Sequence, residues 1–175
     1  IAAWWPMIEA GAEAILINAS GCGAMVKDYA HLLAHDAEWS ERAQKVVSLT
    51  RDLAEWLPEQ LRAGVAEGRV RARSAQRLVF HPPCTLQHGQ KIRGVVEALL
   101  TCGSAGTYSV LQPELSGALR ERKLGHLSAG QPEAILSANI GCITHLQAGT
   151  GTPVRHWIEW VDEQLSAAAS APSTP

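Results

Sequence analysis

The stretch Glu133-Ala134-Ile135-Leu136-Ser137-Ala138-Asn139-Ile140-Gly141-Cys142 is a short apolar run that ends in a Gly–Cys pair. A run of this length, bounded by turn residues, is typical of a buried β-strand. Two other runs end in the same way. Residues 14–18 lead into Gly21-Cys22-Gly23, and residues 77–80 lead into His81-Pro82-Pro83-Cys84. The sequence therefore predicts three strands, each followed by a turn that carries a cysteine.

The run before Cys142 has a copy near the start of the chain. Residues 13–16 read Glu-Ala-Ile-Leu, as do residues 133–136, and in both copies a Gly–Cys pair follows at the same distance without a gap. Because the match falls on a strand and its turn, it indicates an internal duplication. Cys22 then closes the first copy, and Cys142 belongs to the second.

Helical periodicity separates the predicted strands. The clearest stripe, over residues 92–100, has apolar residues at i, i+3, i+4, i+7 and i+8. The pattern over residues 43–57 predicts one helix closed by Pro58. Other helices are expected at residues 2–10 and 25–33, from Pro113 onward, and at 157–165, with a short last strand at 153–155.

Strands that alternate with helices predict an α/β fold with a layered, mostly parallel sheet and flanking helices. In such sheets, ligands bind beyond the carboxyl ends of the strands. The strand–Gly/Pro–Cys turns should lie at this edge. We therefore expect Cys22, Cys84 and Cys142 to converge although they are far apart in the sequence.

The duplication suggests a division of the chain. Residues 1–36 would be the end of a first motif half that is truncated at its N-terminus, and residues 37–166 would be a second half. The chain opens inside an expected helix that contains Trp4 and Trp5, so we expect an N-terminal part to be missing. Residues 167–175, which are Ala, Ser, Pro and Thr, are expected to form a disordered tail.

Composition excludes several classes of protein. Apolar residues make up 46% of the 175 and charged residues 18%, which is enough apolar material for a sizeable core. The net charge is −2 and the basic residues are scattered, so no nucleic-acid partner is expected. No apolar run approaches the ~20 residues of a membrane-spanning helix. Four cysteines are too few for a disulfide scaffold, which favours a reducing compartment.

Three cysteines and a histidine carry the chemical interpretation: Cys84, Cys102, Cys142 and His145. A thiolate at the start of a helix is stabilised by unpaired N–H groups and the helix dipole, which lower its pKa. Iron–sulfur clusters take thiolates as ligands. A glycine such as Gly103 lets the backbone approach inorganic sulfide closely.

Other interpretations of the cysteines remain open. A free cysteine is among the most buried residue types and often only packs in the core. Structural zinc sites usually show two closely spaced ligand pairs, and here only Cys142-x-x-His145 has that spacing. A cysteine nucleophile would require Cys84 to be activated by His81 or His88.

Four blocks around these residues resemble the iron–sulfur subunits of glycolate oxidase. They read NASGCGAMVKDYAHLL at 18–33, FHPPCTLQHGQKIRG at 80–94, CGSAGTYSVLQPELS at 102–116, and ANIGCITHLQAGT at 138–150 followed by VRHWIEWV at 154–161. The blocks stand in the family's order and cover residues 4–165. The chain is more distantly similar to the CCG-domain proteins of lactate utilisation, anaerobic glycerol-3-phosphate dehydrogenase and heterodisulfide reductase.

The resemblance implies an electron-transfer subunit of an oxidoreductase that acts on a 2-hydroxy acid. The full subunit would join a ferredoxin-like part with two [4Fe–4S] clusters to two cysteine-rich CCG motifs. It would receive electrons from a partner subunit that contains FAD and oxidises glycolate to glyoxylate. It would contact a further subunit of the complex and pass electrons towards the respiratory chain. The implied location is cytoplasmic, peripheral at the inner face of the cell membrane and in reach of quinone. No catalytic residue is expected in this chain.

The resemblance also assigns roles to individual residues. Cys84 matches the lone first cysteine of a CCG motif, and Cys102-Gly103 matches the second half of its Cys-Cys-Gly. Cys142 matches the first cysteine of the closing pair. Cys22 matches the final cysteine of the preceding motif. These residues are therefore the expected cofactor ligands.

The chain departs from the family pattern at three cysteine positions. Thr101 precedes Cys102, His145 takes the place of the last cysteine, and Ala19 replaces a cysteine before Cys22. The segment from Cys84 to Cys102 is also shorter than the pattern. Three thiolates with His145 could still hold an iron–sulfur cluster, since histidine can replace cysteine as a ligand.

Two functions of different classes follow. In the first, the chain relays electrons through an iron–sulfur centre near Cys84, Cys102 and Cys142. In the second, it is a metal-free scaffold that docks the flavin subunit and a membrane partner. A role in a lactate, glycerol-3-phosphate or heterodisulfide oxidoreductase, including thiol or disulfide reduction, stays open as an alternative.

Overall fold

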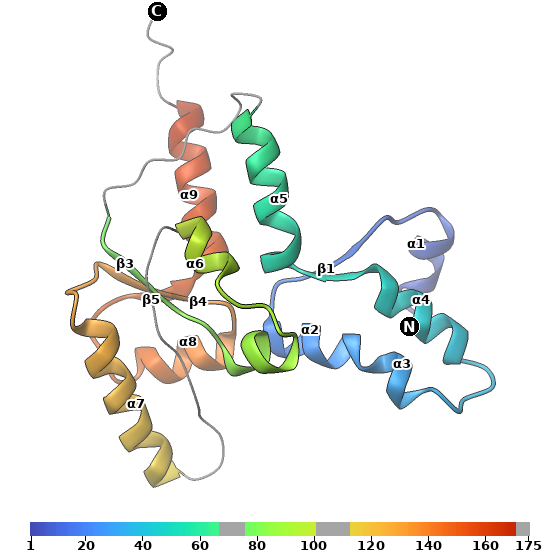
Figure 1. The fold of residues 1–175 in the computed structure, drawn as a ribbon, viewed down its shortest axis with the longest axis horizontal. Coiled ribbons are helices and arrows are strands. Elements are labelled where there is room, and N and C mark those ends of the chain that lie inside the picture. The colour runs from blue at the N-terminus through green and yellow to red at the C-terminus, as the bar shows by residue number, and fades with distance from the viewer. Residues whose placement is uncertain (67–75, 101–112, 171–175) are drawn as a thin grey trace, which may run out of the picture.

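Two small parallel sheets form the centre of the molecule. The computed structural model describes residues 1–66, 76–100 and 113–170, and all strands in these ranges pair in parallel (Figure 1). The first sheet pairs β1 (Ile15–Ile17) with β2 (Thr50–Asp52), and in the second β4 (Ala134–Ser137) lies between β3 (Leu78–His81) and β5 (Val154–His156). The α/β class is confirmed, as are the four strands predicted from the sequence. The strands are divided between two sheets, and β2 is additional.

Helices flank both sheets (Figure 1). The part of the chain around the first sheet contains α1 (Trp5–Glu9), α2 (Ser20–Lys27), α3 (Tyr29–Leu32) and α4 (Ser40–Leu49). The part around the second contains α6 (Val95–Leu100), α7 (Pro113–Ser128), α8 (Ile140–Gln147) and α9 (Trp157–Ser170). Helix α5 (Leu53–Ala66) follows β2, and a π-helix, η1 (Thr85–Gly89), follows β3.

The second sheet is buried on both faces. On one face, Phe80 and Leu136 pack with α5, α6 and α9, where Trp157 is fully buried. On the other face, Ile135 and Val154 pack with residues of α7 and α8. Burial on both sides explains why β4 reads as a continuous apolar run rather than an alternating one. A separate small core forms on α1, α2 and α4 around Ile8, Val26 and Val46.

The single helix predicted over residues 43–57 is wrong, because β2 interrupts it. The hydroxyl of Thr50 donates to the carbonyl of Val46 at 2.8 Å, and such side-chain bonds compete with helical ones. Asp52 then starts α5: its Oδ1 accepts from the N–H of Ala54, while Oε2 of Glu55 accepts from the N–H of Asp52. This is a reciprocal capping box, and Asp-x-x-Glu is its sequence signature. Pro58 lies inside α5 and does not close a helix.

Three helix boundaries also differ from the predictions. The periodic stretch 25–33 is split at Asp28 into α2 and α3, and α6 begins only at Val95. Residues 167–170, expected in the disordered tail, continue α9, because alanine is the strongest helix former. Within the described ranges, no helix has both the length and the apolar character needed to cross a membrane.

The strand registers reveal a second repeat that the sequence analysis missed. Ile15 pairs with Thr50 as Ile135 pairs with Val154, so β2 and β5 occupy equivalent places beside the two copies of the first repeat. Aligned on this register, TRDLAEWLPEQL (50–61) and VRHWIEWVDEQL (154–165) share six of twelve residues. Each copy of the repeat therefore contains a strand, one or more helices, a second parallel strand and a further helix.

The two sheets meet at their carboxyl ends, in a region we call the joint. It is formed by Asn18, Ser20, Asp52, Gln90, Ala138 and His156. The N–H of Ser20 donates to the carbonyl of Ala138 at 3.1 Å, and a ring nitrogen of His156 lies 2.8 Å from the carbonyl oxygen of Asn18. The joint thus connects the end of β1 with the ends of β4 and β5.

Candidate functional site

Three free cysteines stand where strands give way to helices. Cys22 and Cys142 are each the third residue of a helix, α2 and α8, and Cys84 directly precedes η1 at the end of β3. Because β3 and β4 are neighbouring parallel strands, Cys84 and Cys142 lie at the same sheet edge. Burial raises the pKa of Cys142, and the negative charge of a Cys84 thiolate would raise it further. The convergence of Cys22, Cys84 and Cys142 stays a prediction.

The surroundings of Cys142 disfavour a free thiolate. Burial is the largest effect and raises the pKa of its thiol, and the positive charge of Lys123 lowers it only in part. Oδ1 of Asn139 caps α8, accepting from the N–H groups of Gly141 at 2.9 Å and Cys142 at 3.3 Å. The lowered pKa expected for a thiol at a helix start is thus wrong for Cys142. A metal bound there would have to displace the thiol proton, as coordinated metals do.

His81 is buried beside the same edge at the end of β3. Burial, with the nearby charge of Lys123, lowers the pKa of His81 to about 3. The imidazole is therefore neutral at physiological pH and a weak base. A group with so low a pKa is poorly matched to take a proton from a thiol near neutral pH, which argues against activation of Cys84 by His81.

Cys22 is exposed on α2, next to the turn that carries Cys84. The link between these two segments is Ser20, which is 1% exposed and whose hydroxyl lies 2.8 Å from the Thr85 hydroxyl. Thr85 directly follows Cys84. The start of the Cys22 helix and the Cys84 turn are thus held together by a buried polar contact.

The remaining predicted ligands are placed less fully. His145 is half-buried on α8, three residues after Cys142 and therefore on a similar side of the helix. Thr101, Cys102 and Gly103 lie outside the described residues. Among residues 1–66, 76–100 and 113–170, no three His, Cys, Asp or Glu side chains gather as a metal site. The described part contributes two neighbouring thiols, which is half of a four-thiolate set.

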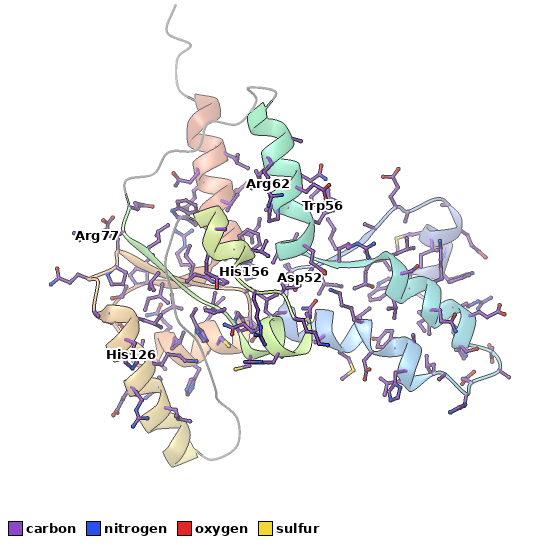
Figure 2. All side chains as sticks on the ribbon, viewed as in Figure 1. Asp52, Trp56, Arg62, Arg77, His126 and His156 are labelled. Atoms are coloured by element: carbon purple, nitrogen blue, oxygen red, sulfur yellow. The ribbon has the colours of Figure 1, made fainter. Side chains whose placement is uncertain are left out.

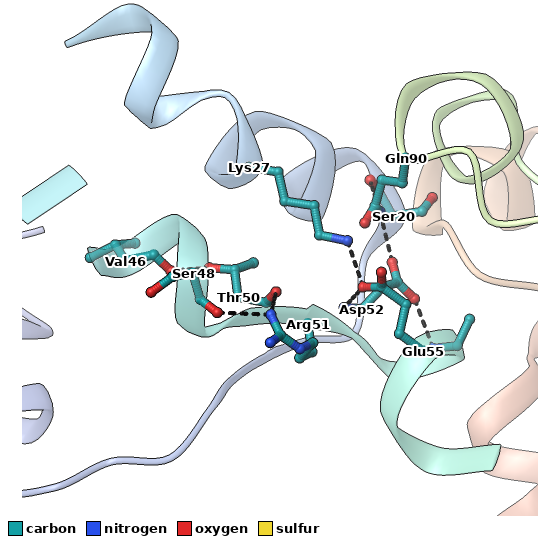
Figure 3. A network of polar contacts seen from close by, with 10 residues as sticks. Ser20, Lys27, Val46, Ser48, Thr50, Arg51, Asp52, Glu55 and Gln90 are labelled. Atoms are coloured by element: carbon teal, nitrogen blue, oxygen red, sulfur yellow. Dashed lines mark hydrogen bonds and ion pairs between the residues drawn. The ribbon is translucent and has the colours of Figure 1, made fainter. Parts of the chain in front are cut away.

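A polar network fills the joint beside the cysteines (Figure 3). Nε2 of Gln90 donates to Oδ2 of Asp52 at 2.8 Å and to the carbonyl of Ser20 at 2.9 Å. Lys27 forms an ion pair with Glu55 at 2.5 Å. Burial raises the pKa of Asp52 although the N–H of Ala54 and the amide of Gln90 both donate to its carboxylate. Of these residues only Asp52 and Glu55 carry a sequence signal, the capping box.

His156 completes the joint from the second sheet, and Figure 2 shows it near Asp52. Since a carbonyl only accepts, Nε2 of His156 carries the proton and donates to Asn18, while Nδ1 accepts from the N–H of Ile158 at 3.3 Å. Burial lowers the pKa of His156, which favours the neutral imidazole over the charged form. His156 and Asp52 hold equivalent places in the second repeat, so that repeat is the signal that would have found His156.

A protein-family model matches part of the chain. The model of a cysteine-rich domain family, CCG, matches residues 95–147, which include Cys102, Cys142 and His145. No solved structure matches the chain significantly.

Three curated relatives show the breadth of the similarity. The glycolate oxidase iron-sulfur subunit of Escherichia coli is 47% identical over 94% of this chain and 43% of its own length. Uncharacterized protein YkgE of the same organism is 30% identical over 79% of the chain and 63% of its own length. Lactate utilization protein A of Shouchella clausii is 26% identical over 78% of the chain and 62% of its own length.

The chain thus spans less than half the length of the E. coli subunit that it matches over nearly all of its own residues. The resemblance seen in the cysteine blocks holds across both halves of the fold. This chain is a homologue of the glycolate oxidase iron–sulfur subunit and contains a CCG cysteine-rich domain.

Proposed function

We propose that the chain relays electrons through an iron–sulfur centre, as part of a glycolate-oxidising complex. Cys84, Cys102 and Cys142 would be its thiolate ligands, and His145 the candidate fourth. Cys22 would serve the preceding motif. The carrying observation is that Cys84 and Cys142 follow two adjacent parallel strands, β3 and β4, at the same edge of the sheet.

The chain's own residues have defined tasks in this proposal. Cys84 and Cys142 bind the centre from neighbouring strand ends, and Asn139 holds the first turn of α8 in place. Lys123 reduces the cost of a thiolate at Cys142, and the neutral imidazole of His81 adds no second positive charge. When bound, the cluster would supply one-electron storage at this edge.

The E. coli relative is named as a subunit, which supports a complex with other subunits. We propose that these are a flavin subunit with FAD as the electron donor and a further subunit, and that the acceptor is quinone-linked at the cytoplasmic face of the membrane. The similarity to lactate utilization protein A extends the proposal to other 2-hydroxy acids. Because the flavin subunit would carry the hydroxyacid chemistry, no substrate-binding residue is assigned here.

Anaerobic reconstitution tests the proposal. The full subunit, with the variants Cys84→Ser, Cys102→Ser and Cys142→Ser, would be loaded with iron and sulfide and examined for metal content and EPR signal. Each variant should lose the signal of this centre while staying folded. Cys22→Ser is the matched control and should keep it. Wild-type protein that is folded but lacks this signal would refute the proposal.

A metal-free docking role is the second candidate, favoured by two exposed apolar side chains beside the cysteines. Met25, one turn after Cys22, is 57% exposed, and Ile140, at the start of α8, is 68% exposed. Exposed apolar groups of this size often mark protein interfaces. If Met25→Lys and Ile140→Lys abolish capture of the flavin subunit while the three cysteine variants retain full complex activity, docking is the function. Loss of activity in the cysteine variants would exclude it as the sole role.

A further inference from the structure

The amide of Gln90 lies between the two halves of the molecule. Gln90 directly follows η1, the π-helix that begins after Cys84. Its Nε2 donates to the carbonyl of Ser20, at the start of the Cys22 helix, and to the carboxylate of Asp52, at the end of β2. One side chain therefore connects the Cys84 turn with both strand ends of the first sheet.

The helix that receives this amide has a glycine, Gly23, at the point of contact. A Cβ at Gly23 would lie 2.8 Å from Nε2 of Gln90 and 3.3 Å from its Cδ, so the end of the Gln90 side chain would have to shift. Gly23 is buried, so a methyl group there could not turn to solvent. The absence of a side chain at Gly23 makes room for the amide against α2, immediately beside Cys22.

The two ends of η1 are tied to the same residue. Thr85 contacts the hydroxyl of Ser20, and Gln90 contacts its carbonyl. Oε1 of Gln90 is buried and finds no donor among the described residues, so the amide is held through its N–H groups alone. A π-helix has a costlier hydrogen-bond pattern than an α-helix and is often found at functional sites, which fits a segment held by external contacts.

We propose that Gln90 is a positioning residue that fixes the Cys84 turn against the Cys22 helix. The lack of a side chain at Gly23 leaves space for its amide. It acts through Ser20 and Asp52 and touches no reacting atom. The assignment goes beyond the cysteine ligands, and its effect on a cluster rests on the proposed function. The contact itself is a property of the metal-free protein, so it can be tested separately.

A double-mutant cycle in the metal-free protein tests the contact. Gly23→Ala should lower the folding equilibrium constant because the methyl group displaces the amide. In a protein that also carries Gln90→Ala, the effect of Gly23→Ala on this constant should be about tenfold smaller. A coupling of that size is within the range measured for residues in contact. Strictly additive effects of the two substitutions would overturn the proposal.

Two chemical readouts separate positioning from general stability. In metal-free protein, Gln90→Leu should speed alkylation of Cys84 by iodoacetamide about threefold or more, followed by mass spectrometry under conditions where the protein stays folded. In reconstituted protein, the same variant should shift the EPR signal at unchanged iron content. Gln87→Leu, on the same π-helix, is the matched control because its amide makes only a 3.5 Å contact to Pro82, and it should leave both readouts unchanged.

The outcomes distinguish this inference from the proposed function. Wild-type protein without iron would count against the cluster, and the cycle and the alkylation rates would then decide the role of Gln90 on their own. Unchanged alkylation in Gln90→Leu, or equal changes in Gln87→Leu, would overturn the positioning role even if the cluster forms.

Discussion

Asn18 and Ala138 are counterparts in the two copies of the first repeat, and each carbonyl accepts a hydrogen bond from the opposite half. Ala138 accepts from the backbone N–H of Ser20 at 3.1 Å, and Asn18 accepts from the ring of His156 at 2.8 Å. The repeat thus continues beyond the strands into the joint. The acceptors are equivalent but the donors are not, because Ser20 aligns with Ile140 and His156 aligns with Asp52.

Replacing Ser20 tests the joint. Ser20→Ala removes the contact between the Ser20 and Thr85 hydroxyls and leaves a part-buried Thr85 without that partner. We expect the free energy of unfolding to fall by about 1–2 kcal/mol, as for a lost buried hydrogen bond. Urea denaturation measures the change. Ser48→Ala, which removes only an exposed local bond to Lys45, should stay within about 0.5 kcal/mol of the wild type. Equal losses in the two variants would contradict a special role for the joint.

His81 should make the protein sensitive to acid. Its pKa falls from 6.5 to about 3 on folding, so the unfolded chain binds the proton more readily than the folded one. The stabilisation is complete above about pH 6.5 and is lost progressively as the pH falls towards 3. His81→Gln should flatten the dependence of the unfolding free energy on pH in this window. His126→Gln, at an exposed position on α7, should not, and a wild-type profile that is already flat would contradict the burial of a neutral His81.

Asp52 should contribute a pH dependence of the opposite sign. Burial raises the pKa of its carboxyl above 3.8, so the folded protein holds this proton more tightly than the unfolded chain. This contribution is most favourable below about pH 4 and is lost as the pH rises through the folded-state pKa. Asp52→Asn should remove that slope and also lower overall stability, because an amide group would then face the amide of Gln90. The matched substitution Asp162→Asn, at an exposed site on α9, should leave the slope unchanged; the measurement is urea denaturation across this pH range.

Lys123 should set the reactivity of Cys142. Its positive charge lowers the thiol pKa of Cys142 against the larger effect of burial, and it also lowers the pKa of His81. Lys123→Met should therefore slow alkylation of Cys142 at a given pH and shift its pH–rate profile upward. The pKa of His81 should rise in the same variant, as read from NMR titration. Lys45→Met, on the exposed side of α4, is the control, and an unchanged Cys142 rate in Lys123→Met would show that the charge is too distant to matter.

Local sequence signals predicted the strands and the cysteine edge well. The runs before Cys22, Cys84 and Cys142 are apolar on both faces and end in turn residues, so burial and turn chemistry indicate the same structure. The stretch 43–57 misled because its helical periodicity continues through β2. The capping box from Asp52 to Glu55 was the competing local signal, and it marks the true start of α5.

Local sequence patterns could not predict the polar contacts of the joint. Gln90 meets Ser20 and Asp52 across 70 and 38 residues of sequence, respectively, and a glutamine in a loop carries no periodicity that announces such contacts. Lys123 acts on Cys142 through space from another helix. Substitutions such as Leu53 against Trp157 make the second repeat hard to recognise in the sequence. The repeat can be aligned only from the strand registers.

Helix α5 starts from the first sheet, yet Ala54, Leu57 and Leu61 pack in the core beside Phe80 and Trp157 of the second. Unfolding of either sheet alone would therefore expose apolar side chains of the shared core to water. We expect heat or urea to unfold both sheets in one cooperative transition. A fragment that begins after Ala66 would lack α5 and would expose the apolar core around Phe80 and Trp157 to solvent.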